Sequence, residues 1–191
     1  MKKDFGVKPA FFPQPVAMIA TYNKDGSVNL MNMAWGGICD NDKIALNLDE
    51  NHLTSQNIKD RRAFTISVAT KETIAGSDYV GLVSGVKDPH KFEKTGFTAT
   101  KSSRVDAPIV NEYPLTLECE VYRIQRDDDL GFRVIGKIVN ILVDESILDE
   151  KGKVDYTKFH AVMFDPFNFG YYQVGEKVAQ AFNVGAPLLK K

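Results

Sequence analysis

Two long runs of strand-forming residues, 115–127 and 132–144, constrain the fold of this chain more than any other feature. They read LTLECEVYRIQRD and FRVIGKIVNILVD, and the four residues DDLG separate them. Runs of this length, rich in β-branched and apolar residues and joined by a short turn, predict a long, strongly curved β-hairpin. Asp127, Asp128 and Asp129 fall at its tip, where we expect a solvated turn rather than a calcium site because no bidentate partner is suitably spaced.

Shorter runs predict further strands and a few short helices. Residues 16–22 and 27–35 flank a turn that contains Asp25 and Gly26, and they predict a second hairpin because glycine tolerates positive φ. Apolar patterning places other strands at 43–49 and 63–70, and helices at 53–62, 71–85 and 88–96. The aromatic segment 163–182 follows neither a helical nor a strand period.

The order of these elements indicates the fold class. Strands and short helices do not alternate regularly, which argues against a doubly wound parallel sheet. We therefore predict a mainly β, antiparallel barrel with short helical insertions, entered by an extended arm that contains several prolines. The sequence shows no internal repeat, low-complexity segment or linker, and 191 residues can form one substantial core. We expect residues 1–191 to form a single domain.

Charge and hydropathy argue against several kinds of partner. The chain has 24 Lys and Arg against 25 Asp and Glu, a net charge of -1, so no global charge favours nucleic acid or an anionic membrane surface. No window approaches the roughly 18 apolar residues that a membrane helix needs. Prolines break up the apolar run near the N-terminus that a signal peptide requires, and we expect a cytoplasmic protein.

The cysteines and histidines form no recognisable cluster. Cys39 and Cys119 are far apart, which gives little support to a zinc site or a disulfide, and strand alternation predicts that Cys119 is a buried thiol. His52, His90 and His160 show neither metal-ligand spacing nor the order of a catalytic triad. We therefore predict no metal site and assign no catalytic residue. A structural role is favoured for His160, with contact to a ring or substrate as the alternative.

Known nucleotide-binding motifs do not fit this sequence. Residues 131–138, GFRVIGKI, match the skeleton of a phosphate loop, but Ile138 stands where a Ser or Thr is required and strand surrounds the motif. The glycine fingerprint of a Rossmann unit is also absent from the sequence. A nicotinamide cofactor would therefore have to bind in some other way.

The short segment NHLTSQNIKD lies between two predicted strands and carries an unusual number of hydrogen-bonding side chains. With Thr54 as N-cap, Leu53 and Ile58 take the two positions of a hydrophobic staple. Ser55 and Asn57 then fall in the first turn, where backbone N–H groups lack partners and the helix dipole favours negative charge. Such a turn can bind a phosphate monoester, although Thr, Ser and Asn are also ordinary capping residues and that alternative stays open.

Two other stretches carry candidate binding groups. In VNLMNMAW, Asn32 and Trp35 lie near the exit of a strand, where an amide can bond the polar edge of a flat heterocycle and the indole can cover its face. Trp35 could equally belong to the core or to a dimer interface. In GVKDPHKFEKTG, Lys91 is a candidate cation for a phosphate, with Lys87 and Lys94 as alternatives, unless these lysines are simply solvated.

Taken together, the motifs resemble the flavin reductase-like family with an FMN-binding split barrel, and in particular its flavoredoxin-like branch. The matching pieces follow the family's order over most of the chain and lie at residues 15–35, 52–60, 91–98 and 171–182. The order of the four pieces indicates the family more specifically than any single piece does.

This resemblance implies a six-stranded antiparallel Greek-key split barrel that forms a homodimer, with FMN near the subunit interface. It also assigns ten residues to the flavin. They are Asn32, Met33, Ala34 and Trp35 along the isoalloxazine, Thr54, Ser55, Asn57 and Lys91 at the phosphate, and Ser84 and Gly85 in the loop before that lysine.

The resemblance further implies an oxidoreductase that transfers electrons or hydride through bound FMN, with NADH or NADPH as an optional transient donor. The chemistry would be that of the flavin, while the protein supplies position, hydrogen bonds and exclusion of water. The alternative is a flavoredoxin-like carrier that exchanges electrons with a redox partner protein and has no small-molecule substrate of its own. A barrel that binds no flavin is a third interpretation.

Overall fold

The computed structural model describes residues 1–127 and 131–190 of the chain. Seven strands form the main sheet, β2 (Ala17–Tyr22), β3 (Val28–Met33), β4 (Trp35–Asp40), β5 (Lys43–Leu48), β6 (Ala63–Val68), β9 (Leu115–Asp127) and β10 (Gly131–Val143). Two small sheets contain β1 (Gln14–Pro15), β11 (Val162–Asp165) and β12 (Gly170–Gln173), and β7 (Ala99–Lys101) and β8 (Pro108–Val110). The helices are α1 (Leu53–Arg61), α2 (Ile74–Leu82), η1 (Glu93–Thr95), η2 (Glu145–Ile147), α3 (Tyr156–Phe159) and η3 (Ala186–Lys190).

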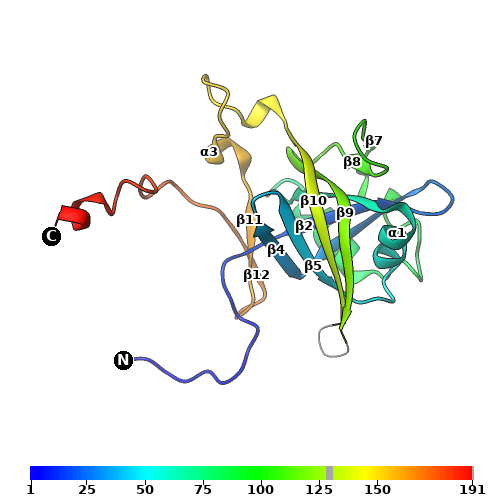
Figure 1. Ribbon diagram of the computed structural model, residues 1–191, viewed down its shortest axis with the longest axis horizontal. Coiled ribbons are helices and arrows are strands. Elements are labelled where there is room, and N and C mark those ends of the chain that lie inside the picture. Colours follow the sequence, from blue (N-terminus) through cyan, green and yellow to red (C-terminus); the bar gives the residue numbers. More distant parts are fainter. Residues whose placement is uncertain (128–130, 191) are drawn as a thin grey trace.

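The main sheet curls into a barrel that is split between its two edge strands (Figure 1). Its order is β3-β2-β6-β9-β10-β5-β4, and every neighbouring pair is antiparallel. The two edges, β3 and β4, are consecutive in sequence and only Ala34 separates them. The chain therefore crosses from one edge of the sheet to the other within one residue, which holds the edges together at that end of the barrel.

The long hairpin of β9 and β10 forms one wall of the barrel, as the sequence predicts. Its curvature comes from two register shifts, between Ile135 and Gly136 and between Ile138 and Asn140, because extra residues bend a strand and increase its twist. Gly136 faces the ring of Phe64, and a Cβ on that glycine would lie 2.4 Å from Cζ of the ring. A larger residue would therefore force the wall away from the core.

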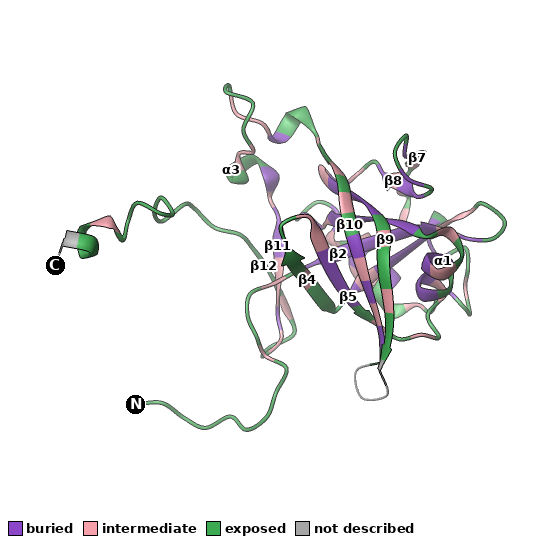
Figure 2. Cartoon of the chain, viewed as in Figure 1, coloured by how far each residue is buried: buried purple, intermediate pink, exposed green. Residues whose placement is uncertain are grey.

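The core lies inside this curled sheet and between the sheet and α2. One buried cluster contains Phe64, Phe132 and Ile58, so α1 closes one end of the barrel. A second cluster packs Val80 of α2 and Val162 of β11 against the other side of the sheet. Burial decreases sharply outside this region, and Figure 2 shows that the N-terminal arm and the C-terminal segment, which leave the barrel on the same side, are mostly exposed.

The structure confirms a mainly β, antiparallel split barrel with short helical insertions, but the main sheet has seven strands rather than six. The predicted strand 27–35 contains β3 and ends at the first residue of β4, so the remainder of β4, residues 36–40, is a strand that was not predicted. The hairpin of β11 and β12 is a second difference, because aromatic residues on both of its faces hide the strand period. Asp128 and Asp129 of the predicted hairpin tip lie outside the described residues.

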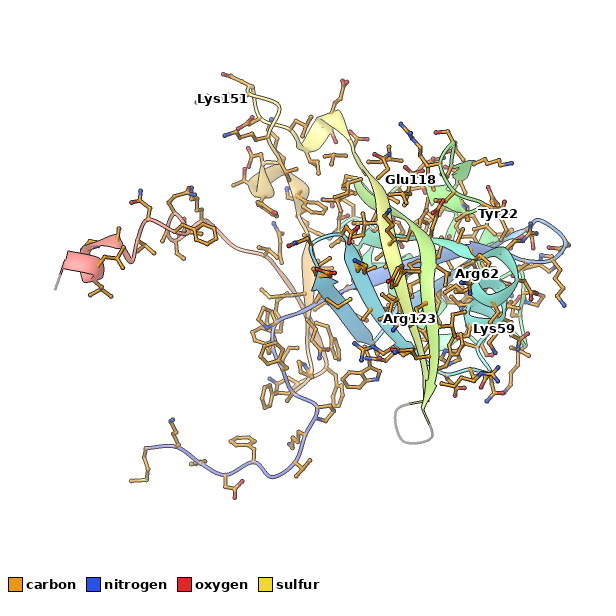
Figure 3. All side chains as sticks on the ribbon, viewed as in Figure 1. Tyr22, Lys59, Arg62, Glu118, Arg123 and Lys151 are labelled. Atoms are coloured by element: carbon orange, nitrogen blue, oxygen red, sulfur yellow. The ribbon has the colours of Figure 1, made fainter. Side chains whose placement is uncertain are left out.

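Polar groups are buried on both faces of the β9–β10 wall. Cys119 is buried as predicted, and burial raises the pKa of its thiol to about 12. The neighbouring Glu118 is also buried, although it falls on the polar side of the alternating pattern (Figure 3). Its carboxylate accepts hydrogen bonds from the Ser102 hydroxyl and from the Asn140 amide, the latter at 2.6 Å. These bonds offset the cost of burying the carboxylate.

Candidate functional site

The crossover between the two edge strands, residues 32–35, borders two cavities. Met33 is buried at the end of β3, whereas Ala34 and Trp35 are exposed. Gly36 follows, and a Cβ there would lie 2.6 Å from both the Ala45 carbonyl oxygen and Sδ of Met33. The tight packing fixes the crossover in place, so Asn32, Met33, Ala34 and Trp35 present a defined surface to both cavities.

A third cavity of about 290 Å³, which we call the α1 pocket, lies at the start of α1. Five of the sequence-predicted residues line it, from β3, α1 and the segment after α2: Asn32, Thr54, Ser84, Gly85 and Lys91. The loop that carries Gly85 passes close to both β3 and α1, because a Cβ there would lie 2.8 Å from Oδ1 of Asn29 and 3.1 Å from Cδ2 of Leu53. Three distant parts of the sequence therefore meet around the α1 pocket.

The N-terminus of α1 borders this pocket, but the helix begins two residues earlier than the sequence suggests. The prediction that Thr54 is the N-cap, with Leu53 outside the helix, is wrong. His52 is the N-cap, its side chain makes no capping bond, and its carbonyl accepts the first helical bond from the Gln56 N–H at 3.2 Å. In the described part of the chain, the N–H groups of Leu53, Thr54 and Ser55 have no acceptor. Uncapped N–H groups at a helix start favour an anion.

The polar side chains of α1 are engaged elsewhere. Thr54 Oγ1 accepts a hydrogen bond from Asn29 at 2.8 Å, and Ser55 Oγ donates to the Asp49 carbonyl at 2.6 Å. Asn57 is buried and donates to Thr21 Oγ1 and Asn23 Oδ1, at 3.1 and 2.8 Å. Ser55 and Asn57 do not line the α1 pocket. They hold the helix against the barrel, and what the helix start offers to a ligand is its backbone.

Lys91 is the cation of the α1 pocket. It is buried, and its Nζ donates to the carbonyl oxygens of Val80 and Val83 at the end of α2, at 2.6 and 2.8 Å. Burial lowers the pKa of its ammonium to about 8. An ammonium has three donors, so a third remains for a ligand. Of the alternatives, Lys94 pairs with Asp88 at 2.6 Å and neither it nor Lys87 lines the pocket.

A cavity of about 690 Å³, the polar pocket, lies on one side of the crossover and adjoins the α1 pocket. Both pockets are lined by Met31, Asn32 and His52. The far wall carries Arg126, which forms an ion pair with Glu50. Lys59, labelled on α1 in Figure 3, also pairs with Glu50 at 2.5 Å and together with Arg126 lowers the pKa of that carboxyl.

The aromatic pocket, a cavity of about 600 Å³, lies on the other side of the crossover. The hairpin of β11 and β12, the N-terminal arm and α2 form its walls. Sequence reasoning did not find Arg126, His52, Asp78 or Tyr171 as lining residues, because only the packing of distant helices and strands brings them to these cavities. His160 lines none of the three cavities, and its Nδ1 contacts Oε1 of Glu72 at 2.7 Å.

Among the described residues, no three His, Cys, Asp or Glu side chains are grouped so that they could hold a metal ion. No helix of the described chain is long and apolar enough to cross a bilayer. A curled antiparallel sheet, split at its edges and flanked by a helix start with open N–H groups, defines a split-barrel fold.

Comparison with known proteins gives the family. The model of the family described as "Flavin reductase like domain" matches residues 10–164, and the chain belongs to that family. The structure of flavoredoxin of Desulfovibrio vulgaris (Miyazaki F) is 36% identical with a TM-score of 0.91, over 97% of this chain and 100% of that one. Flavoredoxin from Methanosarcina acetivorans is 25% identical with a TM-score of 0.85, over 98% and 100%. A protein of Aquifex aeolicus (strain VF5) is 28% identical over 78% of this chain and 79% of its own length.

Proposed function

We propose that this protein is an FMN-dependent oxidoreductase whose α1 pocket binds the flavin phosphate. The observation that carries the proposal is the meeting of two open backbone N–H groups, those of Leu53 and Thr54, with the buried Lys91 ammonium in one pocket that adjoins a larger cavity. The family membership and the similarity to two flavoredoxins support it. Bound FMN would supply the electron or hydride transfer itself.

The residues present fit a phosphate monoester. The N–H groups of Leu53 and Thr54 lie in the first turn of α1, where the helix dipole favours an anion. Lys91 adds a charge-assisted donor, and a bound phosphate would raise the pKa of its ammonium again. Ser84 and Gly85 complete the wall, because the glycine lets the loop approach closely. Asn57 and the Ser55 hydroxyl act indirectly, by holding α1 in position.

The polar pocket suits the isoalloxazine ring. Its wall at the crossover offers the Asn32 amide, the buried Met33 and the exposed Trp35, while Arg126 and His52 face it from other elements. A cation and several hydrogen-bonding groups match the polar edge of a flavin, and an arginine near that edge favours added negative charge. Trp35 and Met33 give the apolar contact that the rest of the ring needs.

Flavin binding can be measured through Trp35, which is the only tryptophan of the chain. Titration of the flavin-free protein with FMN should quench its fluorescence and give a yellow complex, because the indole borders the polar pocket. Lys91→Met should weaken FMN binding about tenfold or more, as expected for loss of a charge-assisted bond. The matched variant Lys94→Met removes an exposed lysine outside the pocket and should leave the affinity unchanged. A colourless protein that does not bind added FMN would refute the proposal.

The electron donor distinguishes two functions for the same site. We propose reduction of the bound flavin by NADH or NADPH, with a flavoredoxin-like carrier as the second candidate because two flavoredoxins are so similar in structure. Stopped-flow mixing of the FMN complex with each pyridine nucleotide separates them. Rapid bleaching of the flavin absorbance supports a reductase. Bleaching by neither nucleotide favours a carrier that a redox partner protein reduces.

We also propose that the protein forms a homodimer with FMN near the interface. β4 is an edge strand whose residues are mostly exposed, and it begins at the crossover with Trp35 and continues with Ile38, which is 66% exposed. An open edge with exposed apolar residues is a common pairing surface. Sedimentation equilibrium should give twice the chain mass, and Ile38→Lys should shift the protein towards the monomer. A monomer at every concentration would contradict this part of the proposal.

A further inference from the structure

Another cavity, which we call the basic pocket, lies at the C-terminal end of α1. It has a volume of about 650 Å³, and in the described chain it shares no lining residue with the α1, polar or aromatic pocket. The charged residues that line it are Arg61, Arg62, Lys101, Arg104, Asp106 and Glu120. The whole chain has a net charge of -1, so this excess of two positive charges is a local feature. It favours an anionic ligand.

The loop between β7 and β8 forms one wall of the basic pocket and is fixed by Ser102. The Ser102 hydroxyl accepts hydrogen bonds from the N–H groups of Arg104 and Val105, both at 2.9 Å, and donates to the buried carboxylate of Glu118. Val105 packs with Ala63 in a small buried cluster, and both residues line the cavity. The backbone of Arg104 is therefore held in place at the rim, and small apolar residues form the floor.

Arg62 stands at a position where glycine is the usual residue. It is the C-cap of α1 with a φ of 57°, in the left-handed region, and its N–H donates to the Ile58 carbonyl at 3.0 Å. Its side chain, labelled in Figure 3, is exposed, and its guanidinium makes a long hydrogen bond of 3.4 Å to the Val121 carbonyl. The fold therefore gains little packing from this arginine. Backbone strain that does not serve packing is typical of a functional site.

The four cations of the basic pocket are not equivalent. Arg61 pairs with Asp106 at 3.2 Å and donates from its other terminal nitrogen to the Asn23 carbonyl at 2.7 Å. The lining cations that form no ion pair in the described part of the chain are Arg62, Lys101 and Arg104. Three such donors suit a phosphate monoester, which has three free oxygens and nearly two negative charges, better than they suit a single carboxylate.

We propose that the basic pocket binds a phosphate monoester of a small organic molecule, with the phosphate held by Arg62 and Arg104 and the organic part on the floor at Val105. The site goes beyond the proposed function, because its residues are separate from the pockets that would hold the flavin. Glu120 also lines the cavity and leaves an excess of two positive charges, which a dianion balances. A phosphodiester, as in nucleic acid, carries one charge per phosphate and matches this excess less well.

Three probes with the same ring test this preference by calorimetry on the protein saturated with FMN, in which the flavin occupies its own site. They are phenyl phosphate, a dianion at about pH 7.5, phenyl sulfate, a monoanion, and phenol, which is uncharged. We expect phenyl phosphate to bind about tenfold more tightly than phenyl sulfate, and phenol to bind most weakly. The affinity for phenyl phosphate should fall several-fold from about pH 7.5 to about pH 5, because the phosphate takes up its second proton. Equal affinities for the phosphate and the sulfate, or no binding of phenyl phosphate, would overturn the proposal.

Variants of the two arginines separate binding from a structural role. Arg62→Gly suits the left-handed backbone, so its melting temperature should stay equal or rise while the affinity for phenyl phosphate falls about tenfold. Arg104→Gln should lower the affinity by a similar factor, and Arg104→Lys by less because the charge is kept. Lys151→Gln is the matched control, because Lys151 lies between η2 and α3, outside the pocket (Figure 3). It should leave the affinity unchanged, and a loss equal to that of Arg62→Gly would overturn the proposal.

The α1 pocket is the main competitor for a phosphate ester, and the same titrations identify it. If phenyl phosphate binds only to the flavin-free protein and FMN displaces it, the probe occupies the α1 pocket and the proposal is wrong. Tighter binding of a single-stranded oligonucleotide than of phenyl phosphate, weakened by Arg62→Gly, would assign the basic pocket to nucleic acid and would also overturn it. Failure of FMN to bind refutes the proposed function alone, because the three probes can still be measured on flavin-free Lys91→Met, whose α1 pocket has lost its cation.

Discussion

The α1 pocket and the aromatic pocket lie on the same barrel but are built in opposite ways. Around the α1 pocket the polar side chains are buried and bonded to one another, as Asn57 is to Thr21 and Asn23. Around the aromatic pocket the key side chains, Phe169 and Tyr171, are exposed and come from a small sheet outside the main barrel. Binding groups in the first region are therefore tied to stability, whereas those in the second can vary with little effect on folding.

This difference determines for which residues the effect of a mutation on ligand affinity can be separated from its effect on stability. A residue of the first region changes affinity and stability together, so only Lys91 and the open backbone groups report on the ligand directly. Mutations in the second region should change ligand affinity with little change in stability, because removal of these exposed side chains loses little buried surface. The comparison predicts that deletion of one hydrogen-bonding group has a much larger effect on stability at the α1 end than at the aromatic end.

Asn57→Ala should give the largest loss of stability. The variant leaves Oδ1 of Asn23 buried without its donor, which costs about 1 to 3 kcal/mol, and it removes one of the two hydrogen bonds that Thr21 Oγ1 accepts, the other coming from Asn29. We expect the free energy of unfolding of the flavin-free protein, measured in urea, to fall by about 2 to 4 kcal/mol. A loss below about 0.5 kcal/mol would show that the network around α1 does not hold the helix.

Lys91 should give an intermediate effect that depends on pH. Its folded pKa of about 8 lies below the ordinary value of 10.5, so between these pH values the unfolded chain binds more protons than the folded one. The stability of the flavin-free protein, relative to Lys91→Met, should therefore rise from about pH 8 to about pH 10. FMN affinity should fall over the same interval, by up to about tenfold per pH unit, because the cation is lost. Parallel pH curves for the two proteins would contradict this assignment.

Tyr171→Phe should give the smallest effect on stability. It removes one exposed hydrogen bond, to Asp78, and keeps the ring, so the free energy of unfolding should change by less than about 1 kcal/mol. Urea unfolding next to Asn57→Ala makes the comparison direct. An equal loss in the two variants would remove the distinction between the two regions.

Much of the barrel could be predicted from the sequence, because its elements carry their own local signals. The β2–β3 hairpin follows from Gly26, which adopts a φ of 86°, and the long hairpin follows from its two strand-forming runs. β4 was not predicted beyond Trp35, because Gly36 and Gly37 interrupt the strand-forming pattern of its sequence WGGICD. The strands β11 and β12 have rings on both faces, which removes the alternation on which strand prediction depends.

Residues of the candidate site that lie within one short segment could be predicted from the sequence. Residues that reach the site through strand register could not. Asn32 to Trp35, Thr54 and Lys91 were found because their motifs lie within single segments. Arg126 reaches the polar pocket only because β9 pairs with β10, and Asp78 meets Tyr171 across 93 residues. The orientation of a side chain could not be predicted from the sequence either. Ser55 and Asn57 have hydrogen-bonding groups that suit a phosphate, yet their side chains bond to other parts of the protein.

The central claim is that the α1 pocket recognises the phosphate of FMN, and the comparison of FMN with riboflavin tests it most directly. The two compounds share the ring and differ in the phosphate, so their affinity ratio isolates the pocket. We predict that the wild-type protein, followed by Trp35 fluorescence at about pH 7, binds FMN at least about 100-fold more tightly than riboflavin, and that Lys91→Met reduces this ratio about tenfold or more. Equal affinities for FMN and riboflavin in the wild-type protein would contradict the account.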